Sequence, residues 1–124
     1  QDNQPIGTAC AWTKNANETG IGYLHMVGVK PNHSGHRLGK WVSLAVIHYF
    51  CDRSFKCVIL ETDDFRLPAV KTYLNLSFVP IFVDTDHPER WKNLFQKLKL
   101  SVLPDQTNSI RSELSDSMLK RIYA

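Results

Sequence analysis

The sequence predicts an α/β fold in which helices flank a central sheet. Strand and helix patterns alternate along the chain, and the segments are long enough for right-handed strand–helix–strand crossovers. The chain has 124 residues, of which 43% are hydrophobic and 22% are charged. This length and balance are typical of one folded domain, and no apolar run approaches the roughly 20 residues that a membrane-spanning helix needs.

An antiparallel hairpin is expected at the start of the chain. Residues 6–12 and 21–29 are rich in small and β-prone side chains, and residues 15–20 between them have turn composition. Gly28 interrupts the second expected strand. A glycine there indicates a β-bulge or a close approach of another backbone.

Strand and helix signals then alternate. Residues 38–52 are apolar almost all round a helix, which predicts a helix buried against the sheet. Residues 56–61 form a short apolar run typical of a buried strand. A helix with Pro68 in its first turn is expected to end near residue 76, and residues 78–83 are expected to form another strand.

Asp63 and Asp64 precede this second helix and are candidate N-caps. Beyond the expected domain of residues 1–84, residues 85–124 are predicted to form a helical extension packed on the same domain. Two amphipathic helices are expected there, with apolar residues at helical spacing: Trp91, Leu94, Phe95 and Leu98, then Ile110, Leu114, Met118 and Ile122.

Three cysteines, Cys10, Cys51 and Cys57, form no CxxC pair. Without a secretory pattern at the start, they are interpreted as reduced and mostly buried thiols, which favours a cytoplasmic location. His33 and His36 lie three residues apart in a loop that offers no further ligand, so no metal site is predicted.

The positive charge is concentrated in one stretch. The net charge of +3 is too small for a general nucleic-acid surface, so no nucleic-acid or membrane partner is predicted. Residues 20–50 contain no Asp or Glu, yet they include Lys30, Arg37 and Lys40. This distribution favours a local site for an anion.

A loop at the start of the long helix is the candidate for that site. Gly35 and Gly39 lie where the helix begins. The first N–H groups of a helix are unpaired and carry partial positive charge, and glycines let a phosphate approach them. The alternative is that these glycines serve only the turn. Neither the Walker A spacing nor the dinucleotide-binding pattern is present.

Two segments resemble signatures of the GNAT superfamily of N-acetyltransferases. VGVKPNHSGHRLGK, residues 27–40, is similar to the acyl-CoA-binding motif, and AVKTYLNLSFVP, residues 69–80, is similar to the second signature. This sequence has Ser34 where the family usually has Arg or Gln, and Arg37 and Ser77 where it usually has Gly. If residue 77 is left-handed, a side chain there costs about 1 kcal/mol.

The resemblance implies a mixed, largely antiparallel sheet and a direct transfer of acetyl from acetyl-CoA to the amine of a small-molecule or peptide acceptor. Tyr73 would be the general acid and His25 the tentative general base. The expected cofactor contacts are Val27, Val29, Ser34, Gly35, His36, Arg37, Leu38, Gly39, Lys40 and Arg66. The alternatives are a core aromatic for Tyr73, an exposed or structural histidine for His25 and a solvated side chain for Arg66.

A second hypothesis is a non-catalytic acyl-CoA-binding or protein-interaction module on the same fold. The family's first strand and two helices have no counterpart before Ile6. The resemblance therefore implies an N-terminally abbreviated fold. We expect a fragment of a longer protein, or a domain whose open side is closed by residues 85–124 or by a second subunit in a homodimer.

Overall fold

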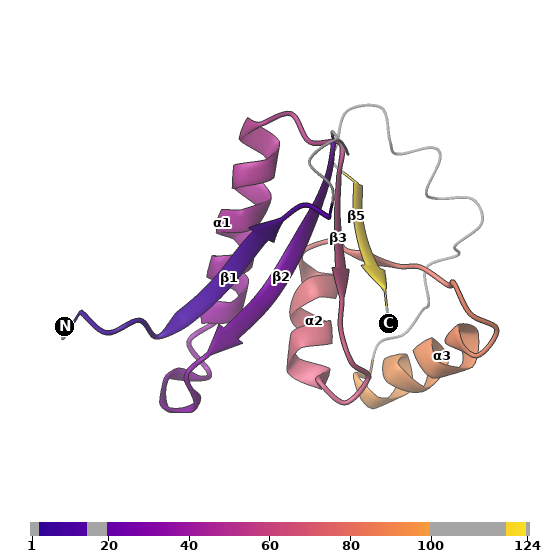
Figure 1. The fold of residues 1–124 in the computed structure, drawn as a ribbon. Helices are drawn as coiled ribbons and strands as arrows, with labels where there is room; N and C mark the ends of the chain where they lie inside the picture. Colours follow the sequence, from indigo (N-terminus) through magenta and orange to yellow (C-terminus); the bar gives the residue numbers. More distant parts are fainter. Residues whose placement is uncertain (1–2, 15–19, 100–118, 124) are drawn as a thin grey trace.

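The computed structural model describes residues 3–14, 20–99 and 119–123. Over these residues it is an α/β structure, as predicted (Figure 1). The elements in chain order are β1 (Gly7–Trp12), β2 (Ile21–Val29), the 3-10 helix η1 (Pro31–His33), α1 (Leu38–Asp52), β3 (Cys57–Glu61), α2 (Leu67–Asn75), β4 (Val79–Pro80), α3 (His87–Lys97) and β5 (Leu119–Tyr123).

The strands form one mixed sheet in the order β1-β2-β3-β5-β4. The predicted hairpin of β1 and β2 is antiparallel. The expectation of a largely antiparallel sheet is wrong, however, because β2 with β3, β3 with β5 and β4 with β5 all pair in parallel. The chain crosses over through α1 between β2 and β3, which makes these two strands parallel, and β5 enters between β3 and β4 in the same direction as both.

The C-terminal segment is not helical throughout. The first expected helix is present as α3, and its Trp91, Leu94 and Phe95 are buried in the same core as residues of α1 and α2. The prediction of the second helix is wrong at its C-terminal end. Residues 119–123 form strand β5, which pairs with the whole of β3. The earlier part of that predicted helix, residues 110–118, lies outside the described residues.

A β-bulge interrupts β2. Thr8 of β1 pairs with Gly28 and Cys10 pairs with His25, so β2 carries an extra residue between these two pairs. Met26 has a φ of 52°, and this left-handed conformation accommodates the extra residue. The sequence therefore predicted a bulge in the correct strand, but its unusual backbone lies at Met26 and not at Gly28.

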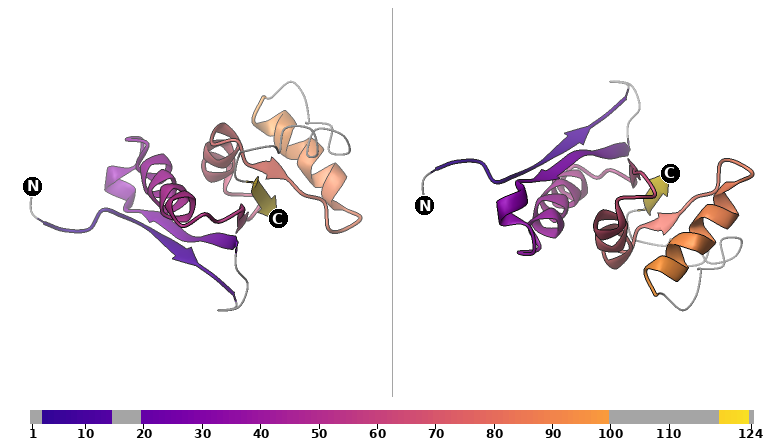
Figure 2. Two further views of the ribbon diagram at one scale, coloured as in Figure 1. Left: turned by 90° about the horizontal axis from the view of Figure 1, so that it is seen from above. Right: turned by 90° about the horizontal axis from the view of Figure 1, so that it is seen from below.

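Helix α1 lies against one face of β1 and β2, and Figure 2 shows it on that side of the sheet. Gly22 of β2 permits the close contact, because a Cβ there would lie 2.5 Å from the ring of Phe50. Leu24 faces the same way and joins Val46, Ile47 and Phe50 in the core. The expectation of mostly buried cysteines is wrong, since Cys10 and Cys51 are exposed and Cys57 is buried.

The backbone at Ser77 yields a stability prediction. Ser77 has a φ of 68°, a left-handed conformation that disfavours any side chain. Ser77→Gly should raise the free energy of unfolding by about 1 kcal/mol, as measured by urea denaturation. Ser34→Gly is the control, because Ser34 has a φ of −66° and glycine there should bring no gain. Equal effects of the two substitutions would contradict the explanation.

Candidate functional site

The site begins where β2 and β3 separate. These strands pair only from Ile21 to Tyr23 and from Cys57 to Ile59. Beyond that point β2 stays paired with β1, while β3 pairs with β5. A cavity of about 390 Å³ opens between the end of β2, the start of α1 and one face of α2. Its lining residues are Val27, Gly28, Val29, His33, Ser34, Gly35, Arg37, Leu38, Gly39, Lys40, Pro68, Ala69, Thr72 and Tyr73.

The N-terminus of α1 makes this cavity suitable for an anion. Trp41 is the first residue whose N–H reaches back within the helix, to the carbonyl of Arg37. Leu38, Gly39 and Lys40 precede it, so their N–H groups have no partner within the helix, and all three residues line the cavity. No acidic residue occupies the first turn of α1. Lys40 and Arg37 add positive charge to that of the helix dipole.

The glycines of the loop face open space. A Cβ added at Gly35 or Gly39 would meet no atom within 4 Å. Gly35 also has a φ of 85°, which favours glycine for the backbone alone. Both residues line the cavity, so the absence of their side chains leaves room for a ligand beside the helix start. This arrangement suits a phosphate group.

Arg37 occupies a position suited to glycine. It is the N-cap of α1 and has φ 58° and ψ 23°, a left-handed conformation that costs about 1 kcal/mol for a non-glycine residue. The departure from the resembled motif therefore strains the backbone locally but leaves the helix start intact. Because the residue also lines the cavity, its guanidinium is available to a phosphate there.

Tyr73 reaches the cavity from α2. Its side chain is 7% exposed and its ring contacts Phe78 at a centroid distance of 6.0 Å. Burial raises the pKa of its hydroxyl above the usual value of 10, although Arg66 acts in the opposite direction. The hydroxyl is therefore protonated at neutral pH and can donate a proton to a group in the cavity.

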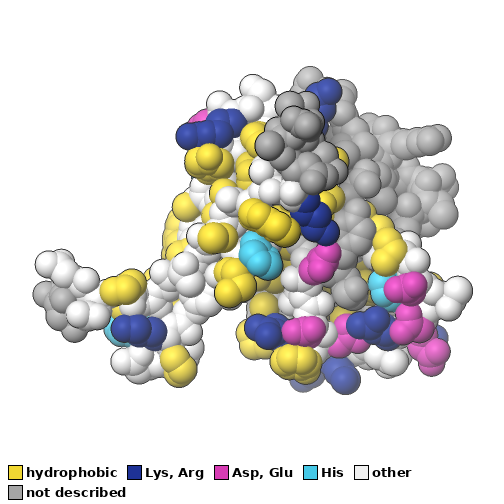
Figure 3. All heavy atoms as spheres, in the orientation of Figure 1, with side chains coloured by type: hydrophobic (Ala, Val, Ile, Leu, Met, Phe, Trp, Pro, Cys, Tyr) yellow, Lys and Arg dark blue, Asp and Glu magenta, His cyan; other side chains and the backbone are white. Residues whose placement is uncertain are grey.

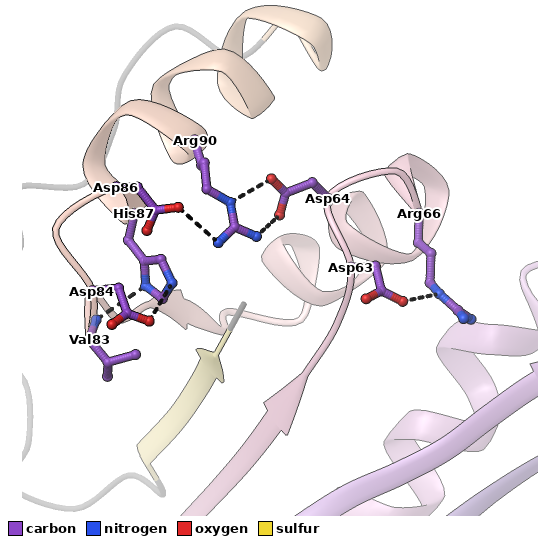
Figure 4. A network of polar contacts seen from close by, with 8 residues as sticks. All are labelled: Asp63, Asp64, Arg66, Val83, Asp84, Asp86, His87 and Arg90. Carbon is purple, nitrogen blue, oxygen red and sulfur yellow. Dashed lines mark hydrogen bonds and ion pairs between the residues drawn. The ribbon is translucent and has the colours of Figure 1, made fainter.

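Three predicted site residues do not line the cavity: His25, His36 and Arg66. His25 is exposed and its ring lies against Trp12, with the two centroids 5.2 Å apart. The Nδ1 atom of His36 lies 3.3 Å from the carbonyl of His33. Arg66 donates a hydrogen bond to Asp63 over 2.9 Å (Figure 4).

Sequence reasoning missed several lining residues on α2. Pro68, Ala69 and Thr72 line the same wall as Tyr73. The signal was available for Ala69, which lies four positions before Tyr73 and so shares its helical face, whereas the places of Pro68 and Thr72 depend on how α2 is oriented against the cavity. Gly28 was noted only as an irregularity of the strand.

The expectation that Asp63 and Asp64 cap α2 is wrong. Arg66 is the N-cap, and no side chain forms a capping hydrogen bond there. Asp64 instead accepts two hydrogen bonds from Arg90 of α3, at 2.8 and 2.7 Å (Figure 4). The two aspartates therefore hold the loop before α2, one through Arg66 and the other through α3.

A cluster at the start of α3 was also not predicted. Potential ligand atoms of Asp84, Asp86 and His87 lie within 4.8 Å of one another. His87 is buried, its Nδ1 accepts a hydrogen bond from the N–H of Val83, and its Nε2 lies 3.6 Å from Asp84 (Figure 4). These contacts stabilise the turn that begins α3.

The chain belongs to the GNAT acetyltransferase family. The family model "Acetyltransferase (GNAT) family" matches residues 1–78, which include the end of β2, α1 and the cavity face of α2. The predicted family resemblance is thereby confirmed. No solved structure matches the chain significantly. Among the described residues, no helix is both long and apolar enough to cross a membrane.

Curated relatives carry the name mycothiol acetyltransferase. The protein from Nocardia farcinica is 37% identical over 75 residues, covering 59% of this chain and 25% of the relative. The one from Thermomonospora curvata is 36% identical over 73 residues, covering 59% and 24%. The one from Arthrobacter sp. is 38% identical over 71 residues, covering 54% and 22%. The matched part thus spans about a quarter of these relatives.

The pair of Asp64 and Arg90 predicts an acid-dependent loss of stability. Hydrogen bonds from Arg90 lower the pKa of Asp64 below its usual 3.8, although partial burial opposes them. A lowered pKa in the folded state stabilises the fold above the unfolded-state pKa, and this contribution is lost as pH falls through the folded-state value. Asp64→Asn should lower the free energy of unfolding by about 1 kcal/mol at pH 7, and this deficit should be smaller at pH 3.

Urea unfolding at the two pH values measures this difference. Asp63→Asn is the matched control, because its single hydrogen bond joins two exposed side chains and should contribute less. If Asp64→Asn lowers the free energy of unfolding by the same amount at both pH values, the stability does not come from the ionised pair of Asp64 and Arg90.

Gly39→Ala separates ligand binding from folding. The added methyl group meets no protein atom, and alanine in a helix is worth roughly 0.5–1 kcal/mol more than glycine. The variant should therefore unfold at higher temperature but bind acetyl-CoA about tenfold more weakly, as measured by calorimetry. If Gly39→Ala binds acetyl-CoA as tightly as the wild type does, Gly39 does not belong to the binding site.

Proposed function

We propose that this chain forms the acetyl-CoA-binding part of an N-acetyltransferase that transfers acetyl by direct attack of an acceptor amine. The main support is that two unlike features line one cavity: the cationic start of α1 and Tyr73, whose side chain carries a hydroxyl. The first suits a pyrophosphate, and the second suits a leaving thiolate. Family membership supports the same activity.

The cofactor would lie along the edge where β2 leaves β3. The amides of Leu38, Gly39 and Lys40 would donate hydrogen bonds to its pyrophosphate, assisted by the side chains of Arg37 and Lys40. Val27 and Val29 would contact its pantetheine arm. When bound, acetyl-CoA supplies the activated thioester.

Proton transfers complete the proposed reaction. The amine nitrogen forms a bond to the acetyl carbon, the carbon–sulfur bond breaks, and the hydroxyl of Tyr73 gives its proton to the departing sulfur. Tyr73 carries that proton at neutral pH, as an unperturbed tyrosine also would, and burial raises its pKa further. His25 stays the proposed base. Because its side chain is exposed on β2, it would take the proton of an amine arriving on its own side of the sheet.

Tyr73→Phe tests the assignment of the acid. Loss of the hydroxyl should reduce the turnover number about 100-fold, because general acid catalysis typically contributes that much or more. The affinity for acetyl-CoA should change less than twofold. Turnover is followed by release of coenzyme A thiol over an amine panel, and affinity by calorimetry.

Tyr49→Phe is the matched control, because Tyr49 lies on α1 and does not line this cavity. Equal turnover of Tyr73→Phe and the wild type would refute the role of Tyr73. Acetyl-CoA binding without thiol release from any amine would favour the non-catalytic acyl-CoA-binding module instead.

A further inference from the structure

One face of the sheet carries an aromatic and acidic cluster that lies outside the cavity. Gly22 and Leu24 face α1, so Tyr23 and His25 point to the opposite face. The ring of Trp12 on β1 lies 5.7 Å from that of Tyr23 and 5.2 Å from that of His25. In the parallel register Gly22 lies beside Val58 and Tyr23 beside Ile59, so Glu61, two residues after Ile59, lies on the same face as Tyr23. We call Trp12, Tyr23, His25 and Glu61 the open-face cluster.

An ammonium group of the protein already occupies this cluster. The Nζ atom of Lys14 lies 4.9 Å from the ring centroid of Tyr23 and 3.8 Å from Oε1 of Glu61. An aromatic ring and a carboxylate together are the groups that recognise an alkylammonium. Figure 3 shows this face, where a histidine, hydrophobic side chains and charges of both signs gather over β1, β2 and β3.

The contacts of Lys14 are replaceable. The side chains of Lys14 and Glu61 are 46% and 66% exposed, so water weakens their ion pair. Trp12 is also 44% exposed. The ring and the carboxylate are therefore accessible to an external ammonium, which has to displace only the weakly held side chain of Lys14.

We propose that the open-face cluster is the recognition site for the acceptor, and that the acceptor is a primary amine on an unbranched alkyl chain, bound in its ammonium form. Lys14 has this chemistry and acts as an internal competitor for the site. The proposal rests on the proposed acetyl transfer, and it deepens it by naming the acceptor class. The acceptor would lie on the face of the sheet opposite the cofactor cavity, and its amine would reach the thioester through the gap that opens where β2 and β3 cease to pair beyond Tyr23 and Ile59.

Direct titration tests the site without requiring activity. The full 124-residue chain is titrated with n-butylammonium chloride at constant ionic strength, with n-butanol as the uncharged control. The indole N–H signals of Trp12, Trp41 and Trp91 are followed by NMR. The Trp12 signal should shift and saturate with butylammonium only. The signal of Trp91, which is buried, reports that the fold is intact.

Two charge variants set the direction of the effect. Lys14→Met should bind butylammonium about fivefold more tightly because the competitor is removed, and Glu61→Gln about fivefold more weakly. Lys92→Met and Glu89→Gln, exposed residues of α3, remove the same charges elsewhere and should change nothing. Equal binding of butanol, a silent Trp12 signal or unchanged affinity of Glu61→Gln would overturn the proposal.

Enzyme assays separate this inference from the proposed function. With an alkylamine as acceptor, Glu61→Gln should raise KM for the amine about fivefold and leave the affinity for acetyl-CoA unchanged. Butylammonium binding as expected, but without coenzyme A release by the wild type, would refute acetyl transfer and support the ammonium site. Normal coenzyme A release by the wild type, together with a KM for the amine that Glu61→Gln leaves unchanged, would support acetyl transfer and refute the ammonium site.

Discussion

The separation of β2 from β3 beyond Tyr23 is the constraint on which the rest of the site depends. If the parallel pairing continued, the end of β2 would be covered by β3 and no cavity would form. Instead β2 remains hydrogen-bonded to β1 alone, and the bulge at Met26 shifts the alternation of its side chains. Val27 therefore packs against the core, while the strand end leads through η1 and the loop with Gly35 to the start of α1.

The charge distribution of this cavity favours an anion. Its walls carry Arg37, Lys40 and the N-terminus of α1, and none of its lining residues is acidic. The nearby aspartates are neutralised elsewhere, since Asp63 contacts Arg66 and Asp64 contacts Arg90. An anion at the helix start thus meets attraction from the backbone and side chains without an opposing carboxylate on the walls. The same pairings fix the loop before α2, and α2 carries Tyr73.

The parts that could be predicted from sequence are those with local causes. The hairpin, α1, α2 and the glycine loop follow from turn composition, apolar spacing and Pro68, and most of the cavity wall follows from them. The C-terminal strand could not be predicted, because residues 110–122 have helical apolar spacing, whereas β5 depends on pairing with β3 far away in the chain. The partner of Asp64 was missed for the same reason, since Arg90 lies 26 residues away. Glu61 was missed because its neighbourhood is formed by three different strands.

The central claim is that the start of α1 binds the pyrophosphate of coenzyme A. Backbone amide NMR shifts of the full chain during titration with coenzyme A test it directly. The account predicts the largest shifts at Leu38, Gly39 and Lys40, with downfield movement from new hydrogen bonds, and small shifts in α3. Saturable binding whose largest shifts fall on α3 or on the face of the sheet that carries Trp12, with the start of α1 unchanged, would contradict it.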